Sequence, residues 1–177
     1  MQPTFLIGIY NEDDTPNFCP ITWVSVTHDD NNFLLVISMN GSKKTKENIK
    51  RTGFLSVNLA STDMLELLDY FGSRSGKDGQ KNEIPYDCES GFALPVPTLD
   101  LSRWVYECKV VNTVQNGDTT TYFCKTENVQ IIETIKDNTD DLFYPDLTLL
   151  DPVIYSGRYH SVDKCLGKIG DFYKTDA

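Results

Sequence analysis

The sequence predicts a mainly β fold in which antiparallel strands form a closed or partly closed barrel with short helical inserts. Six or more segments have the composition of strands, whereas only two have helical character. Strands and helices do not alternate as in a doubly wound sheet, and no Gly-x-Gly-x-x-Gly motif follows a strand. With 177 residues, 40% of them hydrophobic, the chain can form one domain with a proper core, and we expect residues 1–177 to be that domain.

Three strands are expected at the start of the chain. They cover residues 4–10, 17–26 and 33–38, and each is rich in aromatic, β-branched or other large apolar residues. The turns between them, Asn-Glu-Asp-Asp-Thr-Pro and Asp-Asp-Asn-Asn, are polar. This arrangement of short strands and polar turns is typical of antiparallel sheets.

Two helices and a further strand follow. The first helix is predicted over residues 44–52, with Gly53 as its C-terminal stop, and a strand follows over residues 54–59. The second helix has Asp63 as its expected N-cap and Gly72 as its end. Its apolar face follows the spacing i, i+3, i+4 and i+7. The residues of that face are Met64, Leu67, Leu68 and Phe71.

The second half of the chain contains the clearest hairpin. Residues 73–97 hold several Gly and Pro residues and little periodicity, so we expect a long surface excursion there. Residues 104–110 alternate between apolar and mostly charged side chains, the Asn116-Gly117 pair favours a tight turn, and residues 119–134 return as a long strand. From residue 137 on, we expect an acidic loop and a tail interrupted by glycines.

Composition excludes several classes of function. The formal net charge of −10 and the pI of about 4.5 would repel nucleic acids and anionic membranes, so neither is an expected partner. No segment approaches the ~20 apolar residues of a membrane span, and no signal peptide is visible, so we expect a cytoplasmic protein. Five widely spaced cysteines without a Cys-x-x-Cys motif, and only two histidines, argue against a metal site or a disulfide framework.

A basic cluster stands out from this acidic background at the start of the first predicted helix. An apolar strand ends there in a turn of small residues, and Lys43 and Thr45 follow it. Backbone N–H groups at a helix start, beside a hydroxyl and an ammonium group, suit a phosphate. The alternative is a lysine-rich surface helix that Thr45 only caps. The cluster consists of Lys43, Lys44, Lys46, Lys50 and Arg51.

Two further segments have a structural and a functional interpretation. Trp23 is either a core residue of its strand or the shield of a planar ring whose polar edge bonds to its neighbours. Residues 73–81 are either a solvated loop or a Gly- and Lys-containing cover for a ligand. No catalytic nucleophile is apparent, because Gly-x-Ser-x-Gly is absent and neither His28 nor His160 has a partner pattern.

Motifs that occur in a fixed order across essentially the whole chain carry a resemblance. They are Pro16-Asn17, Thr22-Trp23, Lys43-x-Thr45-x-x-Asn48-Ile49, Asp69-Tyr70-Phe71-Gly72, Ser75-Gly76-Lys77-Asp78-x-x-Lys81, Glu107-Cys108-Lys109-Val110-Val111 and Gly167-Lys168-Ile169-Gly170. Together they resemble the flavin reductase-like, FMN-binding split-barrel family, which includes the flavoredoxins. The resemblance implies an antiparallel Greek-key split β-barrel that forms a homodimer and holds FMN at or near the subunit interface.

The resemblance also implies which residues would contact FMN. The phosphate would lie at Lys43 and Thr45, where many relatives have Arg in place of Lys43. Lys81 is the candidate for a cation beside the pyrimidine edge of the flavin ring. The expected contacts at the phosphate are Lys43, Thr45, Ser38 and Asn48, those along the ring are Thr22, Trp23, Val24 and Ser25, and those that close over it are Ser75, Gly76 and Lys81.

The activity that the resemblance implies is hydride transfer from NAD(P)H to FMN, with electrons passing on to free flavin or an electron-transfer protein. Because the cofactor carries this chemistry, no catalytic acid or base is expected in the chain. Three alternatives stay open: an FMN-binding electron carrier or sensor without NAD(P)H turnover, a split-barrel flavoprotein of the pyridoxamine-phosphate-oxidase type, and a structural dimer with an empty pocket.

Overall fold

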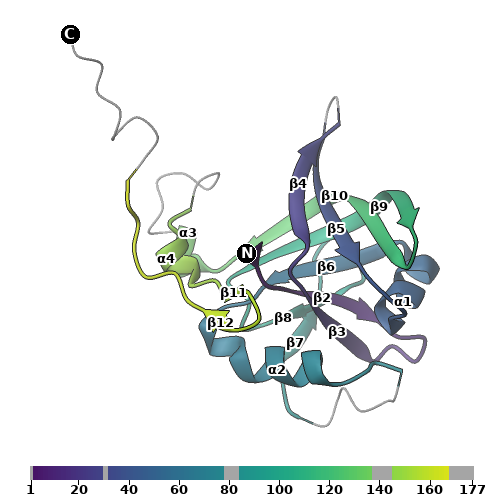
Figure 1. Cartoon of the computed structure of the whole chain (residues 1–177), viewed down its shortest axis with the longest axis horizontal. Helices are drawn as coiled ribbons and strands as arrows, with labels where there is room; N and C mark the ends of the chain where they lie inside the picture. Colours follow the sequence, from purple (N-terminus) through teal and green to yellow (C-terminus); the bar gives the residue numbers. More distant parts are fainter. Residues whose placement is uncertain (1, 30–31, 78–83, 137–144, 168–177) are drawn as a thin grey trace.

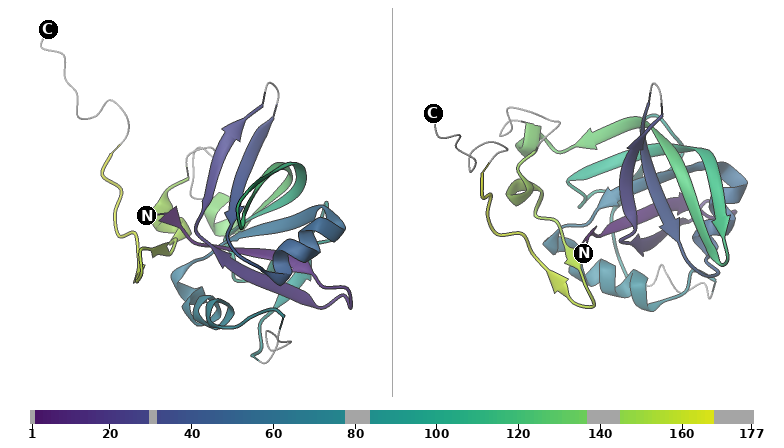
Figure 2. Two further views of the ribbon diagram at one scale, coloured as in Figure 1. Left: turned by 45° about the vertical axis from the view of Figure 1, so that its right-hand side comes forward. Right: turned by 45° about the horizontal axis from the view of Figure 1, so that its top comes forward.

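A seven-stranded antiparallel sheet, curled into a barrel, forms the body of the molecule (Figures 1 and 2). The computed structural model describes residues 2–29, 32–77, 84–136 and 145–167. The order of strands in the sheet is β3-β2-β6-β9-β10-β5-β4, so β3 and β4 are its two edges. The strands are β2 (Phe5–Tyr10), β3 (Pro16–Ile21), β4 (Val24–His28), β5 (Phe33–Met39), β6 (Phe54–Leu59), β9 (Trp104–Asn116) and β10 (Thr119–Ile131).

Two small sheets accompany the barrel. β7 (Cys88–Ser90) pairs with β8 (Pro97–Leu99), and β1 (Gln2–Pro3) pairs with β11 (Ile154–Tyr155), which in turn pairs with β12 (Tyr159–His160). The chain after β10 therefore returns to the N-terminal strand, as Figure 1 shows.

Helix α1 (Lys44–Thr52) links β5 to β6, and it ends at Gly53, whose φ of 73° is left-handed. A 3₁₀ turn (Thr62–Met64) precedes α2 (Leu65–Ser73), and the short helices α3 (Glu133–Lys136) and α4 (Leu147–Leu150) follow the barrel. Across the described ranges, none of these helices has the length and apolar character needed to cross a bilayer.

The alternation of side chains along β2 separates two apolar cores. Ile7 and Ile9 face the barrel interior, where they join buried residues such as Ile37 of β5 and Leu55 of β6. Leu6 instead lies in a second core, in which α2 packs against the outside of the barrel. Because successive residues of a strand face opposite sides, one strand serves both cores.

Most of the elements expected from the sequence are confirmed. The strands near residues 4–10, 33–38 and 54–59 are present, as is the first helix with its stop at Gly53. The predicted hairpin is β9–β10, in which Gly117 (φ 55°) and Asp118 form a two-residue turn.

Three details of the sequence prediction are wrong. Residues 17–26 do not form one strand, because β3 pairs with β2 whereas β4 pairs with β5, and the chain changes partner at residues 22–23. Asp63 does not cap α2; it lies within the 3₁₀ turn, and its carboxylate is 2.6 Å from Arg103. Gly72 does not end α2, which continues to Ser73.

The described parts of the excursion, residues 73–77 and 84–97, contain more regular structure than expected. They contain β7, and they end in β8, all three residues of which are buried. β8 lies against β6, where the Ser56 hydroxyl donates to the carbonyl of Pro97 over 2.5 Å. The prediction of a surface segment is therefore wrong for the last part of this range.

Candidate functional site

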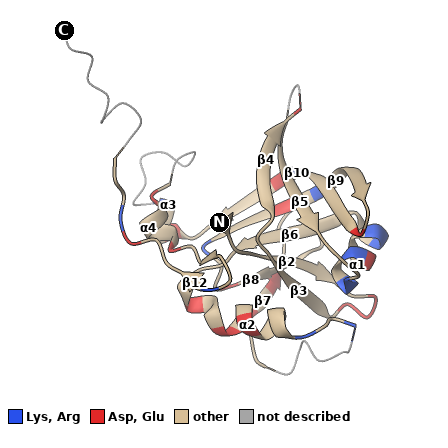
Figure 3. Ribbon diagram, viewed as in Figure 1, with Lys and Arg blue, Asp and Glu red and all other residues tan. Residues whose placement is uncertain are grey.

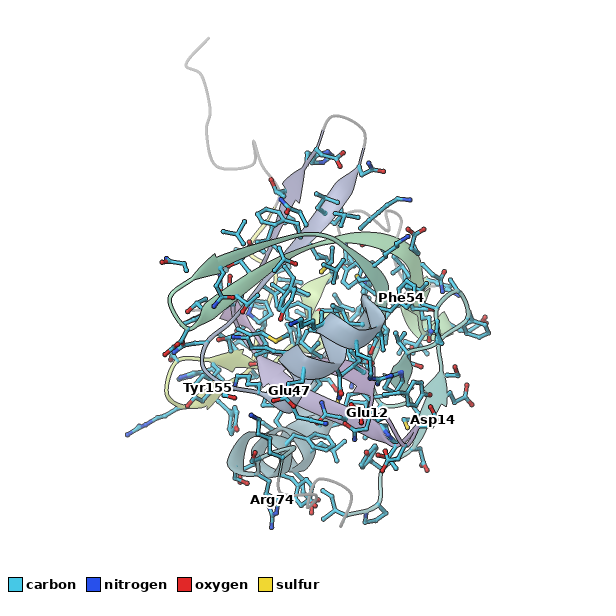
Figure 4. The ribbon with its side chains drawn as sticks, turned by 90° about the vertical axis from the view of Figure 1, so that its right-hand side faces the viewer. Glu12, Asp14, Glu47, Phe54, Arg74 and Tyr155 are labelled. Atoms are coloured by element: carbon cyan, nitrogen blue, oxygen red, sulfur yellow. The ribbon has the colours of Figure 1, made fainter. Side chains whose placement is uncertain are left out.

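A cavity of about 350 Å³ lies between the start of α1 and the end of α2. One wall is made by residues 42–45 and the other by residues 71–76. Asn17, Cys19 and Pro20 of β3 also line it. Figure 4 shows the same side of the molecule, with Glu47 on α1 and Arg74 just after α2. Three segments that are distant in sequence therefore meet around one cavity.

The start of α1 presents a polar, positively charged wall to this cavity. Lys43 is the N-cap residue, its backbone is extended, and among the described residues no side chain caps the helix. The first N–H groups of a helix have no partner within the helix, and the helix dipole favours an anion there. Thr45, in the first turn, is 2% exposed, and its hydroxyl accepts a hydrogen bond of 3.0 Å from the Asn17 side-chain amide.

Only part of the basic cluster faces the cavity. Lys43 and Lys44 line it. Lys46 instead donates to the carbonyls of Gly41 and Asp118, and Arg51 donates to the carbonyl of Tyr10. Figure 3 shows the blue Lys and Arg residues gathered on α1. The cluster therefore has two roles, since some of its cations hold α1 on the barrel while two face the cavity.

The segment of residues 73–77, which we call the strap, covers the other side of the cavity. Lys77 reaches across to α1, where its ammonium group is 2.9 Å from Glu47 and donates to the Ser42 hydroxyl over 2.6 Å. The hydrogen bond between the Lys77 ammonium group and the Glu47 carboxylate holds the pKa of Glu47 below its ordinary value. At Gly76, an added Cβ would lie 2.5 Å from Asn17 Oδ1 and 3.2 Å from Lys44 Cβ, so the close approach of the strap requires glycine.

The predicted ring contacts lie at the connection between β3 and β4. Trp23 is 54% exposed, so the core interpretation of this residue is wrong. Its carbonyl accepts a hydrogen bond of 2.9 Å from the N–H of Ser38, which ties the connection to β5. Thr22 is half-buried, Val24 belongs to the barrel core, and Ser25 is exposed.

The cavity thus brings together only some of the predicted cofactor residues. Lys43, Thr45, Ser75 and Gly76 line it, whereas residues 22–25 do not. Ser38 is hydrogen-bonded to Thr121 of β10, and Asn48 donates to Asn11 over 2.8 Å from the buried face of α1. Lys81 lies outside the described residues.

Sequence reasoning missed three residues of this site. Asn17 is 2% exposed, Ser42 lines the cavity, and Lys77 bridges the strap to α1. Asn17 and Lys77 belong to the motifs that carry the family resemblance. The sequence pattern does not show, however, that an Asn in a strand faces a cavity. Their contacts are with segments distant in sequence, so only the fold brings them together.

Two larger hollows, of about 470 and 690 Å³, lie elsewhere. The first lies beside Asn128 and Gln130 of β10, and the second lies on the other flank of α1, beside Lys50 and Tyr122. The second hollow shares Ser42 and Lys43 with the 350 Å³ cavity and is also lined by the buried residues Thr120 and Tyr122, but neither hollow includes Thr45 of the first helical turn or the strap. We therefore take the 350 Å³ cavity as the candidate site.

A fully buried carboxylate near the first of these hollows is structural. Glu107 accepts hydrogen bonds from the backbone N–H groups of residues 92–94 and from the amides of Asn128 and Gln130. Burial alone raises the pKa of Glu107, but these donors outweigh it and hold the pKa below its ordinary value. A carboxylate held ionised by five donors is poorly suited to accept a proton.

Comparison with known proteins gives a consistent result. The model of the family described as "Flavin reductase like domain" matches residues 1–163. No curated protein sequence matches the chain.

Solved structures show which fold the chain shares. The flavoredoxin of Desulfovibrio vulgaris (Miyazaki F) has a TM-score of 0.85 and 22% identity, over 97% of this chain and 92% of that one. A structure from Shewanella frigidimarina, described as a flavin reductase with a split barrel domain, has a TM-score of 0.82 and 22% identity, over 94% and 85%. An FMN-binding protein from Thermus thermophilus has a TM-score of 0.73 and 20% identity, over 90% and 85%. The split-barrel fold expected from the sequence is confirmed.

Proposed function

The chain belongs to the flavin reductase-like family of flavin-related oxidoreductases, and we propose that it binds FMN and transfers hydride from NAD(P)H to it. Electrons would pass on to free flavin or to an electron-transfer protein. The expectations of one domain over residues 1–177 and of a cytoplasmic location stay predictions.

The observation that carries this proposal is the chemistry of the cavity. A phosphate monoester needs N–H and O–H donors and a positive charge, and the start of α1 offers backbone N–H groups, the Thr45 hydroxyl and the ammonium groups of Lys43 and Lys44. The strap approaches closely only because residue 76 is glycine. The residues present therefore fit the phosphate end of FMN, and an FMN-binding protein is among the solved structures of similar fold.

The remaining predicted residues would hold the flavin ring and the cavity walls. Trp23 offers an exposed aromatic face, and Thr22 and Ser25 offer polar groups for the edge of the ring. Ser38 and Asn48 would lie near the phosphate, and each has a hydrogen bond within the protein, Ser38 with Thr121 and Asn48 with Asn11. When bound, FMN supplies the hydride-accepting chemistry, so the chain's part is to bind and orient the reactants.

A homodimer is part of the proposal, with FMN at or near the subunit interface. It is supported by the family resemblance and by the edge strand β4, on which Val26 is 59% exposed. Phe33 of β5, which pairs with His28 of β4, is 43% exposed. Exposed edges and apolar side chains of this kind are usual at sites of association.

The test is to identify the chromophore of the purified protein and then to mix the protein anaerobically with NADH or NADPH. We expect heating to release FMN, and we expect one of the two nucleotides to bleach its absorbance. FMN that neither nucleotide bleaches would favour the carrier or sensor alternative. A protein that binds no flavin, even when FMN is added, would contradict the proposal.

Substituting the two predicted phosphate contacts tests the site itself. Lys43→Ala combined with Thr45→Val removes a charge and a hydroxyl donor, so we expect FMN affinity to fall by about a hundredfold or more. Lys50→Ala is the matched control, because Lys50 is exposed on the same helix and does not line the cavity. Flavin content after gel filtration and titration of the apo protein measure both. Equal affinity in the double variant and the control would place the phosphate elsewhere.

A further inference from the structure

A buried hydrogen bond joins the floor of the cavity to its charged wall. Asn17 on β3 and Thr45 on α1 are each 2% exposed, and the amide nitrogen of Asn17 donates to the Thr45 hydroxyl oxygen over 3.0 Å. Both residues line the cavity. The pair therefore lies at the position where the proposed phosphate would meet α1.

The direction of this hydrogen bond determines what Thr45 can do. An amide –NH₂ group can only donate, so the Thr45 oxygen is the acceptor, and its own proton must point to another group. None of the described residues accepts that proton. A buried hydroxyl with its proton unused is a donor available to an anion in the cavity.

The two ends of the Asn17 side-chain amide face different segments. Its nitrogen donates to Thr45 of α1, whereas Oδ1 lies on the side of the strap, 2.5 Å from the position that a Cβ on Gly76 would take. A side chain at residue 76 would therefore crowd the amide that bonds to Thr45.

We propose that Asn17 is a positioning residue that fixes the Thr45 hydroxyl as a donor to a phosphate monoester in the cavity. This inference rests on the proposed function and extends it, because it makes the Asn17–Thr45 pair a determinant of selectivity for phosphorylated over non-phosphorylated flavin. Asn17 acts through Thr45, to which it is hydrogen-bonded.

Selectivity distinguishes this role from a merely structural one. FMN and riboflavin differ only in the phosphate, so the ratio of their affinities isolates the phosphate end of the site. A residue that only supports the fold changes both affinities and the thermal stability together. A residue that directs the Thr45 proton changes the ratio.

The experiment measures this ratio by fluorescence titration of the apo protein with FMN and with riboflavin. In Asn17→Asp the carboxylate can only accept, so it draws the Thr45 proton away from the cavity, and we expect the preference for FMN to fall at least about tenfold. Thr45→Val should lose the preference to a similar degree, whereas Thr45→Ser, which keeps the hydroxyl, should retain it. Asn11→Asp is the charge control, because it places a carboxylate against α1 while preserving the acceptor for Asn48.

A double-mutant cycle shows whether Asn17 acts through Thr45. Asn17→Ala should reduce the preference by about threefold in the wild-type background and leave it unchanged in Thr45→Val. Circular dichroism and thermal unfolding establish that each variant is folded. Because Asn17→Ala and Thr45→Ser add no charge, they keep the test valid if Asn17→Asp does not fold.

The possible outcomes separate this inference from the function on which it rests. Additive effects of Asn17→Ala and Thr45→Val would overturn the inference, as would an Asn17→Asp variant that loses both flavins equally. If the wild type prefers FMN but substitutions of Asn17 do not change the ratio of FMN to riboflavin affinity, the inference is wrong. The proposed function is unaffected by that result. A wild-type protein that binds neither flavin overturns both.

Discussion

The Glu107 carboxylate is fully buried yet ionised, because five donors surround it. Glu107→Gln turns two acceptor oxygens into one oxygen and an –NH₂ group that faces other donors. We therefore expect a loss of about 2–4 kcal/mol in the free energy of unfolding near pH 7. Urea denaturation measures this loss, with Glu127→Gln as the control, because Glu127 is exposed on β10 and forms a surface ion pair with Lys125.

The same residue gives a pH dependence with a defined sign. The pKa of Glu107 in the folded protein is lower than in the unfolded chain, so its stabilisation is present above the ordinary pKa of a glutamate, near 4.5, and is lost as the pH falls through the folded value. The stability difference between wild type and Glu107→Gln should therefore narrow in acid. If the free energies of unfolding of wild type and Glu107→Gln differ by the same amount at about pH 7 and about pH 3, the negative charge of Glu107 is not the cause of its stabilisation.

Trp23 is a residue whose exposure separates ligand binding from folding. Since its side chain is 54% exposed, Trp23→Ala should shift the unfolding midpoint by less than about 3 °C while lowering flavin affinity about tenfold. Flavin titration and the visible spectrum of the bound flavin measure the second effect. Phe92→Ala is the control, because Phe92 is an aromatic residue that is 84% exposed and lies outside the β3–β4 connection, where the ring is proposed to bind. If Trp23→Ala binds flavin with the affinity and visible spectrum of the wild type, the flavin ring does not lie against Trp23.

At the scale of elements, Arg103 holds the chain after the barrel in place. Its guanidinium group donates to the carbonyl of Leu149 over 3.0 Å and is 2.6 Å from the Asp63 carboxylate. A lysine has one ammonium nitrogen in place of the two terminal nitrogens of the guanidinium group, so it cannot make both contacts in the same geometry. Arg103→Lys should therefore increase hydrogen exchange in α4 and β11. Arg51→Lys is the control, because Arg51 donates to one carbonyl that lysine can also reach. Unchanged exchange in both elements would contradict this role.

At the scale of the whole molecule, the proposed dimer depends on the β4–β5 edge. We expect sedimentation to give twice the chain mass of 20.1 kDa, and Val26→Lys to shift the protein towards monomer with weaker flavin retention. Leu166→Lys, a similar change at a residue that is 76% exposed in the tail, should leave the mass unchanged. A monomeric wild type with full flavin binding would argue against an interface site.

The features that sequence predicts well here are local. The helix stop at Gly53 and the β9–β10 turn depend on neighbouring residues, and both are confirmed. The break at residues 22–23 could not be predicted, because both sides are extended and only the pairing partners differ. The contacts of Lys46 and Arg51 could not be predicted from the sequence either, because the acceptors are backbone carbonyls that the fold brings to these side chains.

The position of the β9–β10 hairpin has a consequence for how the protein is made. Among the described residues, those that line the cavity all lie within the first 76 of the chain, yet β5 and β6, which flank α1, are separated in the sheet by this hairpin. Its turn residue Asp118 receives hydrogen bonds from Gly41 and Lys46. A growing chain on the ribosome therefore carries the described lining residues of the cavity before it carries β9 and β10, the strands that join β5 to β6 in the sheet.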